Sequence, residues 1–359
     1  MRQRPPPGDT RTVHLDATGH PLHTRALSVG LFQRDDAKLD VRAAIIDLRK
    51  RGVVPVGGDI QGPGLIHHMQ LAGIVDPATA TLETIAAAQP AVAFEASATS
   101  AGESCRDPID AIRAVAGACL DDTFRRNISA AIGGPRGCSH VATLAHLLGA
   151  TTAWALEREQ AAHGCGAARP TGQRVFQRDV IVDGQEPRAG TIILALQLTD
   201  LHFAPSAPLA RPIERFAGEL EFRVRAEVDL AAGLRLVRIT GAERRRERAD
   251  LASAPWRDRD DLLQGLTGIG LGPGVTGELL ARLGEGNADD RPLRDGLLML
   301  APTLVQCAAT LAEGWVVAAQ RSSSIVGMGA LPDSCYMWRR GGALWRVRQD
   351  EAREATGQE

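Results

Sequence analysis

The segment CRDPIDAIRAVAGACL, residues 105–120, decides the fold because it aligns without a gap on WRDRDDLLQGLTGIGL, residues 256–271. The offset is 151 residues, and it pairs identical residues within these segments and beyond them. The identical pairs are Arg106 with Arg257, Asp107 with Asp258, Asp110 with Asp261, Gly117 with Gly268, Leu120 with Leu271, Ala130 with Ala281, Gly133 with Gly284 and Leu147 with Leu298. A similarity that recurs at a fixed offset indicates a repeat, so we expect a degenerate tandem duplication.

The residues upstream of each segment also correspond. IHHMQLAGIVDPATATLETIAAA (66–88) and LEFRVRAEVDLAAGLRLVRITGAE (220–243) are apolar-rich runs, and each is broken after Val-Asp by small residues suited to a turn. Alternating apolar positions predict half-buried antiparallel strands over 24–33, 40–49, 65–75 and 80–88, and again over 175–183, 191–201, 218–229 and 234–242. Helical patterns follow over 107–117, 121–132 and 138–158, and again over 258–267, 274–284 and 293–313.

Strands followed by helices predict an α+β fold, in which an antiparallel sheet carries its helices on one face. We expect two related units packed as a pseudo-dimer, as the fusion of a homodimer would give. The expected organisation is a disordered N-terminal arm (1–21), a first repeat with the candidate site (22–162), a Gly-rich linker (163–173), a degenerate second repeat (174–313) and a C-terminal tail without a counterpart (314–359).

The composition is that of a folded protein without a marked charge preference. The 359 residues carry a net charge of −2, so nothing global attracts the chain to nucleic acid or to an anionic membrane. Aromatic residues make up 4%, too few to favour a stacking platform for single strands. The opening MRQRPPPGDTRT lacks the apolar stretch of a signal peptide, and six Cys in this length do not suggest a disulfide framework. We expect a cytoplasmic protein with reduced thiols, as a monomeric pseudo-dimer or a homodimer.

Cys138 and His140 are candidate reactive residues in GGPRGCSHVATLAHLLG. The Gly-rich turn leads into an apolar-periodic helix, so both side chains are expected near a helix N-terminus, which lowers a thiol pKa. A nearby imidazole then serves as a base or as a second metal ligand. Alternatively, Cys138 is a small buried residue, Ser139 caps the helix and His140 lies on the surface.

Cys105 and His67 are the other two candidates. Cys105 lies just before a predicted helix, and His67 and His68 lie on a predicted strand, where neighbouring side chains point to opposite faces. At most one of the two histidines therefore faces the core or a site, and a lone strand histidine is usually structural. Two cysteines at separate helix starts and a histidine on a neighbouring strand are expected to converge.

The second repeat is an internal comparison for these candidates. It carries Trp256, Asp289, Arg291 and Leu220 where the first repeat has Cys105, Cys138, His140 and His67. The reactive residue types are absent there although the apolar framework remains. This favours a functional site in the first repeat.

Residues 22–157 resemble a bacterial family known as domain of unknown function 2889. The resemblance rests on HTRALSVGLFQRDD (23–36), LDVRAAIIDLRK (39–50), IHHM (66–69), Cys105 and GGPRGCSHVATL (133–144). Family members typically read IHDM and GCTHL, where this chain has His68 and Ser139, and residues 91–104 form a longer segment than expected. The resemblance places His67, Cys105, Cys138 and His140 on signature positions and implies no activity.

Three functions remain open. The first is a small-molecule enzyme, a lyase, isomerase or hydrolase, whose catalytic residues are Cys138, His140, Cys105 and His67. The sequence has neither a GxGxxG motif after a strand nor a Walker-type GK[ST] motif. We therefore expect no nicotinamide, flavin or nucleotide cofactor. The second is a zinc site formed by the same four residues. The third is an iron–sulfur or accessory scaffold, suggested by fold-level analogy, with ERRRERAD (243–250) as a solvated charged loop.

Overall fold

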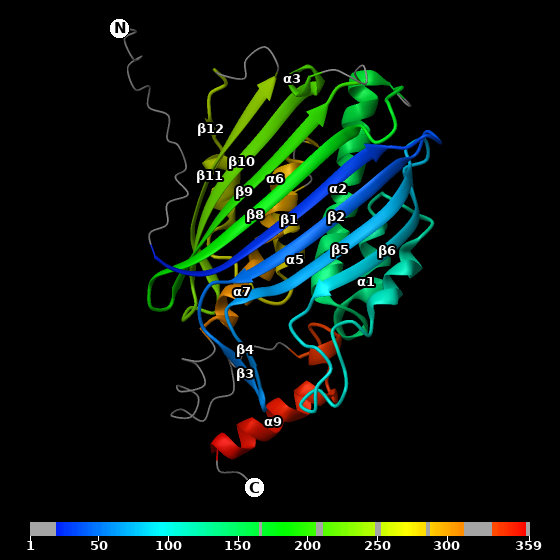
Figure 1. Ribbon diagram of the computed structural model, residues 1–359. Coiled ribbons are helices and arrows are strands. Elements are labelled where there is room, and N and C mark those ends of the chain that lie inside the picture. The colour runs from blue at the N-terminus through cyan, green and yellow to red at the C-terminus, as the bar shows by residue number, and fades with distance from the viewer. Residues whose placement is uncertain are drawn as a thin grey trace.

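A single ten-stranded antiparallel sheet organises the described part of the chain (Figure 1). The computed structural model describes residues 19–164, 167–205, 211–247, 253–284, 288–311 and 332–356. The strand order is β12-β11-β10-β9-β8-β1-β2-β5-β6-β7, with every neighbouring pair antiparallel. The first half supplies β1 (His20–Gln33), β2 (Leu39–Arg49), β5 (Gly64–Asp76), β6 (Thr81–Ala91) and β7 (Ala118–Cys119). The second half supplies β8 (Arg174–Arg188), β9 (Thr191–Phe203), β10 (Phe216–Asp229), β11 (Arg235–Glu247) and β12 (Arg257–Asp258).

The eight long strands fall where the alternating patterns predict them. Strand β2 shows why: its side chains alternate between the core and the other face, so every second residue from Leu39 to Arg49 is buried. The same parity that buries Val41 and Ile45 also buries Asp47 and Arg49. The core-facing side of β2 therefore ends in charged side chains rather than apolar ones.

The helices that complete the α+β fold cover one face of the sheet (Figure 1). In the first half, a 3₁₀ helix (Ile109–Val115) precedes α1 (Phe124–Ile132) and the long α2 (Ser139–His163). In the second half, the strands are followed by α4 (Asp260–Leu263), α5 (Val275–Leu283), α6 (Arg291–Leu297) and α7 (Leu300–Ala309), and the short α3 (Pro212–Arg215) precedes β10. No helix in the described ranges is long and apolar enough to span a membrane.

One predicted helix is broken in two. The pattern over 293–313 predicts a continuous helix, whereas α6 ends at Leu297 and α7 begins at Leu300. Pro302 explains the break, because it has no N–H to donate to the carbonyl of Leu298, four residues earlier. Helix α7 lies beside β1 as well as β8 and β9.

Two other expectations are corrected by the strands. Residues 1–18 of the expected arm lie outside the described residues, and His20 and Pro21 already belong to β1. The charged run at 243–250 is not a loop as far as residue 247, because β11 continues through Glu247. Its arginines lie against acidic neighbours: Arg244 Nη2 is 2.6 Å from an oxygen of Glu221 on β10.

The C-terminal tail has a defined place in its described part, residues 332–356. Helix α9 (Ala343–Thr356) lies beside the short hairpin of β3 (Val54–Val56) and β4 (Asp59–Gln61) (Figure 1). A small apolar cluster joins the two segments and contains Val54, Val56, Cys105, Met337, Trp338 and Leu344. Arg348 donates to the carbonyl of Pro55 at 2.7 Å, and Tyr336 N donates to the carbonyl of Gly137 at 2.8 Å. The tail is thereby attached to both the hairpin and the turn before α2.

Candidate functional site

The register of three neighbouring strands builds the site. Arg25 on β1 lies directly opposite Asp47 on β2, and Asp47 lies directly opposite His67 on β5. Directly opposed residues in an antiparallel sheet are close enough for their side chains to interact. Because all three face the core, the register alone forms a row of buried polar groups.

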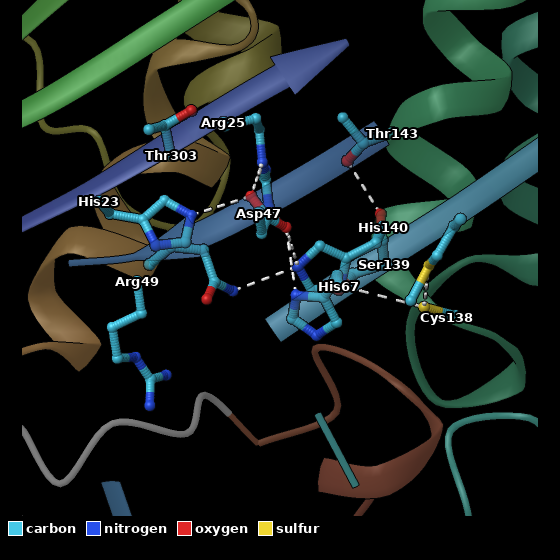
Figure 2. A network of polar contacts seen from close by, with 12 residues as sticks. His23, Arg25, Asp47, Arg49, His67, Cys138, Ser139, His140, Thr143 and Thr303 are labelled. Carbon is cyan, nitrogen blue, oxygen red and sulfur yellow. Dashed lines mark hydrogen bonds and ion pairs between the residues drawn. The ribbon is translucent and has the colours of Figure 1, made fainter. Parts of the chain in front are cut away.

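Asp47 is the centre of this row (Figure 2). Its carboxylate accepts two hydrogen bonds from Arg25, Nε to Oδ1 at 2.8 Å and Nη2 to Oδ2 at 2.9 Å. It also accepts from His23 Nε2 at 2.9 Å and from His67 Nδ1 at 3.1 Å. Burial alone would raise the pKa of Asp47, but the Arg25 cation and the two histidine hydrogen bonds hold it well below its ordinary value. Asp47 is therefore an anion that orients both imidazoles.

His140, near the start of α2, completes the group. Its ring stacks on that of His67 with a centroid distance of 3.7 Å and a tilt of 31°. His140 Nε2 lies 3.4 Å from Asp47 Oδ2 and 3.2 Å from the side-chain nitrogen of Gln306 on α7. Burial lowers the pKa of both His67 and His140 below the ordinary value of 6.5. Both rings are neutral at pH 7.

The cysteines lie beside this group as protonated thiols. Cys138 occupies the N-cap position of α2, and its Sγ is 3.9 Å from His140 Nδ1 and 3.7 Å from Met69 Sδ. Burial raises the pKa of Cys138 to about 12 and that of Cys105 well above its ordinary value. The expectation of a lowered thiol pKa is therefore wrong, because desolvation outweighs the backbone N–H groups at the helix start.

A cavity of about 220 Å³ joins these residues. Cys105, Cys138, His67 and His140 all line it, so the four candidates do converge on one space. Two guanidinium groups, Arg25 and Arg49, also line it. Its walls are mostly apolar and come from all parts of the chain: Val54, Ile66, Phe94, Val305, Met337 and Trp338. Such a cavity suits a small organic molecule held by a few polar groups.

Part of the chain matches a known protein family. Residues 23–154 match the family described as Protein of unknown function (DUF2889). The match confirms the resemblance read from the sequence motifs. No curated protein and no solved structure matches the chain significantly.

The DUF2889 segment contains nearly the whole polar cluster. Its first residue is His23, and it runs through Asp47, His67 and Cys105 to Cys138 and His140 within α2. Gln306 on α7 and the cavity wall at residues 334–338 lie outside it. The second half and the tail therefore add to a site whose polar core lies in the DUF2889 segment.

The arrangement of possible metal ligands differs from the predicted set of two cysteines and two histidines. Among the described residues, the group whose ligand atoms lie within 4.8 Å of one another is Asp47, His67 and His140. Cys105 and Cys138 line the adjoining cavity but do not belong to that group. Asp47 thus holds the place next to the histidines that the sequence analysis gave to the thiols.

Five residues of this site were not predicted from the sequence: Asp47, His23, Arg25, Arg49 and Gln306. A signal for four of them is present within the quoted motifs: they are charged or imidazole residues at core-facing positions of β1 and β2. A charge at a position whose parity buries it must find a partner inside the protein. Gln306 carries no such local signal, because its approach to His140 depends on the packing of α7.

Proposed function

We propose that the chain is an enzyme for a small organic molecule, acting without a nucleotide cofactor as a lyase, isomerase or hydrolase. The observation that carries the proposal is the oriented pair of histidines on the cavity wall: His67 is hydrogen-bonded to Asp47, and His140 is stacked on it. Perturbed titratable groups with a specific charge partner in a cavity are typical of functional sites.

The proposed chemistry is proton transfer. His67 donates Nδ1–H to Asp47, which leaves the lone pair on Nε2 for a substrate proton. The protonated form that results is stabilised by the Asp47 anion, as a carboxylate partner does for a general base. His140 supplies a second imidazole beside it. Cys138, with its raised pKa, serves as a hydrogen-bond donor to the ligand rather than as a thiolate nucleophile.

We also propose that the two halves are duplicated units packed as a pseudo-dimer. The order β1-β2-β5-β6 on one side of the sheet corresponds to β8-β9-β10-β11 on the other, and β1 pairs with β8 at the centre. Phe176 and Leu220 take the strand positions of His23 and His67, each 153 residues later. The second half then carries the framework without the imidazoles, which favours chemistry in the first half. A reducing compartment such as the cytoplasm would keep the cavity thiols reduced.

The experiment is a turnover screen in D₂O followed by proton NMR. The full chain is incubated with small hydroxy, keto, amide and ester compounds; isomerase or lyase activity removes a C–H signal or creates an olefinic one, and hydrolysis gives two products. We expect His67→Leu and His140→Gln to lower the rate by about 10²–10⁴-fold, as expected for loss of a general acid or base.

His68→Gln is the matched control, because His68 neighbours His67 on β5 but points to the other face of the sheet. It should keep the wild-type rate. Turnover that persists in both His67→Leu and His140→Gln would overturn the proposal.

A metal site is the second candidate, and the observation for it is the close grouping of Asp47, His67 and His140. A carboxylate that orients a ligating histidine is common around zinc. Against it, both oxygens of Asp47 already accept hydrogen bonds from Arg25, and the Arg25 and Arg49 cations line the same cavity. Metal analysis of protein purified without chelator tests it: one equivalent of zinc, lost in His140→Gln but kept in His68→Gln, would favour the metal site over metal-free acid–base chemistry.

A further inference from the structure

Two buried arginine–aspartate pairs lie at matching places in the two halves of the sheet. Arg25 faces Asp47 across β1 and β2, and Arg178 faces Asp200 across β8 and β9. Arg178 and Asp200 each come 153 residues after their counterparts. The geometry is also the same: Arg178 Nε donates to Asp200 Oδ1 at 2.6 Å, and Nη2 donates to Oδ2 at 2.7 Å.

The pairs differ at the third guanidinium nitrogen. Arg178 Nη1 donates to Asp295 Oδ2 at 2.6 Å and lies 3.3 Å from Thr151 Oγ1. Arg25 Nη1 is fully buried and has no hydrogen-bond partner among the described residues. A buried charged donor without an acceptor is costly, so the free position calls for an acceptor from elsewhere.

Arg49 repeats this pattern on the same cavity wall. Its Nη1 donates to the carbonyl of Gln61 at 2.9 Å, while its buried Nε has no partner among the described residues. Burial lowers the pKa of Arg49 to about 10, so it is still a cation at neutral pH. The described residues that line the cavity include no Asp or Glu. The described lining therefore carries two guanidinium groups and no carboxylate, and Asp47, which pairs with Arg25, is not one of the lining residues.

We propose that the cavity binds the carboxylate of a small ligand, which pairs with the guanidinium groups of Arg25 and Arg49 on its wall. For Arg25 the ligand carboxylate does what Asp295 does for Arg178 in the second half. If the chain is the proposed enzyme, its substrates are small carboxylates. Carboxylate binding itself does not depend on catalysis. Planar guanidinium groups suit carboxylates well. The apolar walls and the volume of about 220 Å³ fit a compact hydrocarbon body, such as one ring or a short chain.

The test is calorimetric titration of the full chain with benzoate, with benzyl alcohol as the neutral probe of the same shape. We expect benzoate to bind at one site and benzyl alcohol to bind at least about tenfold more weakly, as loss of a hydrogen bond to a charged group implies. Arg49→Gln should weaken benzoate about tenfold to a hundredfold. Arg169→Gln is the matched control, because Arg169 has a similarly buried side chain, pairs with Glu159 and does not line the cavity.

Equal binding of benzoate and benzyl alcohol by the wild-type chain would overturn the inference, and this comparison stands even if Arg49→Gln fails to fold. So would unchanged benzoate binding in a folded Arg49→Gln. Inorganic phosphate binding more tightly than benzoate would overturn the carboxylate assignment. Because titration needs no turnover, carboxylate binding can fail while the D₂O reaction persists, or the reverse, so the two proposals fail separately.

Discussion

The two halves of the sheet bury the same arginine–aspartate pair but complete it differently. In the second half, Asp295 takes the remaining nitrogen of Arg178, and Phe176 and Leu220 pack where the first half has imidazoles. In the first half, histidines gather around Asp47, and the last nitrogen of Arg25 has no partner among the residues that the structure describes. The buried ion pair is therefore common to both halves, whereas the histidines that contact its carboxylate belong to the first half.

The largest expected effect is a difference in stability between the variants Asp47→Asn and Asp200→Asn. Asp47→Asn removes the carboxylate that pairs with Arg25, so we expect it to lower the free energy of unfolding by about 3–5 kcal/mol. Asp200→Asn should cost less, because Asp295 still neutralises Arg178. Chemical denaturation of both variants measures the difference. An equal or larger loss in Asp200→Asn would show that Asp295 does not support its pair.

A smaller effect is expected when the second half is made to resemble the first. Asp295→Ala leaves Arg178 Nη1 with Thr151 alone, which should cost about 1.5–3 kcal/mol, the range for a hydrogen bond to a charged group. Added acetate should then restore part of the lost melting temperature by supplying a carboxylate.

The wild-type chain in acetate is the first control. The second is chloride at equal ionic strength, added to the wild-type chain and to Asp295→Ala. Rescue by chloride to the same extent would point to general screening and would contradict a specific carboxylate position.

The histidines predict how stability depends on pH. Burial lowers the pKa of His23, His67 and His140 below 6.5, so below that pH the unfolded chain binds protons that the folded chain refuses. Stability is therefore unaffected by these groups above about pH 6.5 and falls as the pH decreases below it, by up to about 1.4 kcal/mol per pH unit for each histidine. Unfolding measured between pH 7.5 and 5.5 should show a shallower decline in His140→Gln than in wild type. Parallel curves would mean that His140 accepts a proton freely.

The smallest expected change in stability comes from replacing one first-half residue by its second-half counterpart. His67→Leu introduces the residue found at the matching position, Leu220, which is buried in β10. Asp47 keeps its bonds to Arg25 and His23, so we expect the free energy of unfolding to change by less than about 1 kcal/mol. Turnover should nevertheless be lost. A large loss of stability would show that His67 is needed for packing, which would weaken its proposed role as a base.

The fold was predictable from local patterns because alternation along one strand records which face is buried. The eight long strands, the place of α2 and the position of Cys138 and His140 at its start follow from such patterns, whereas the joining of both halves into one sheet through β1 and β8 depends on residues far apart in the sequence. Asp47 was missed because a charge within an alternating strand resembles a solvent-facing position until the register shows Arg25 and His67 beside it. The predicted lowering of the Cys138 pKa was wrong because this pKa depends on burial, to which distant segments of the chain contribute.

The cavity wall formed by residues 334–338 is synthesised much later than the histidines of the site. His140 precedes this wall by about 200 residues, and synthesis at 5–20 residues per second separates the two by roughly 10–40 seconds. Residues 334–338 are therefore the last of the described lining to be synthesised, and the hydrogen bond from Tyr336 N to the carbonyl of Gly137 joins them to the turn before α2.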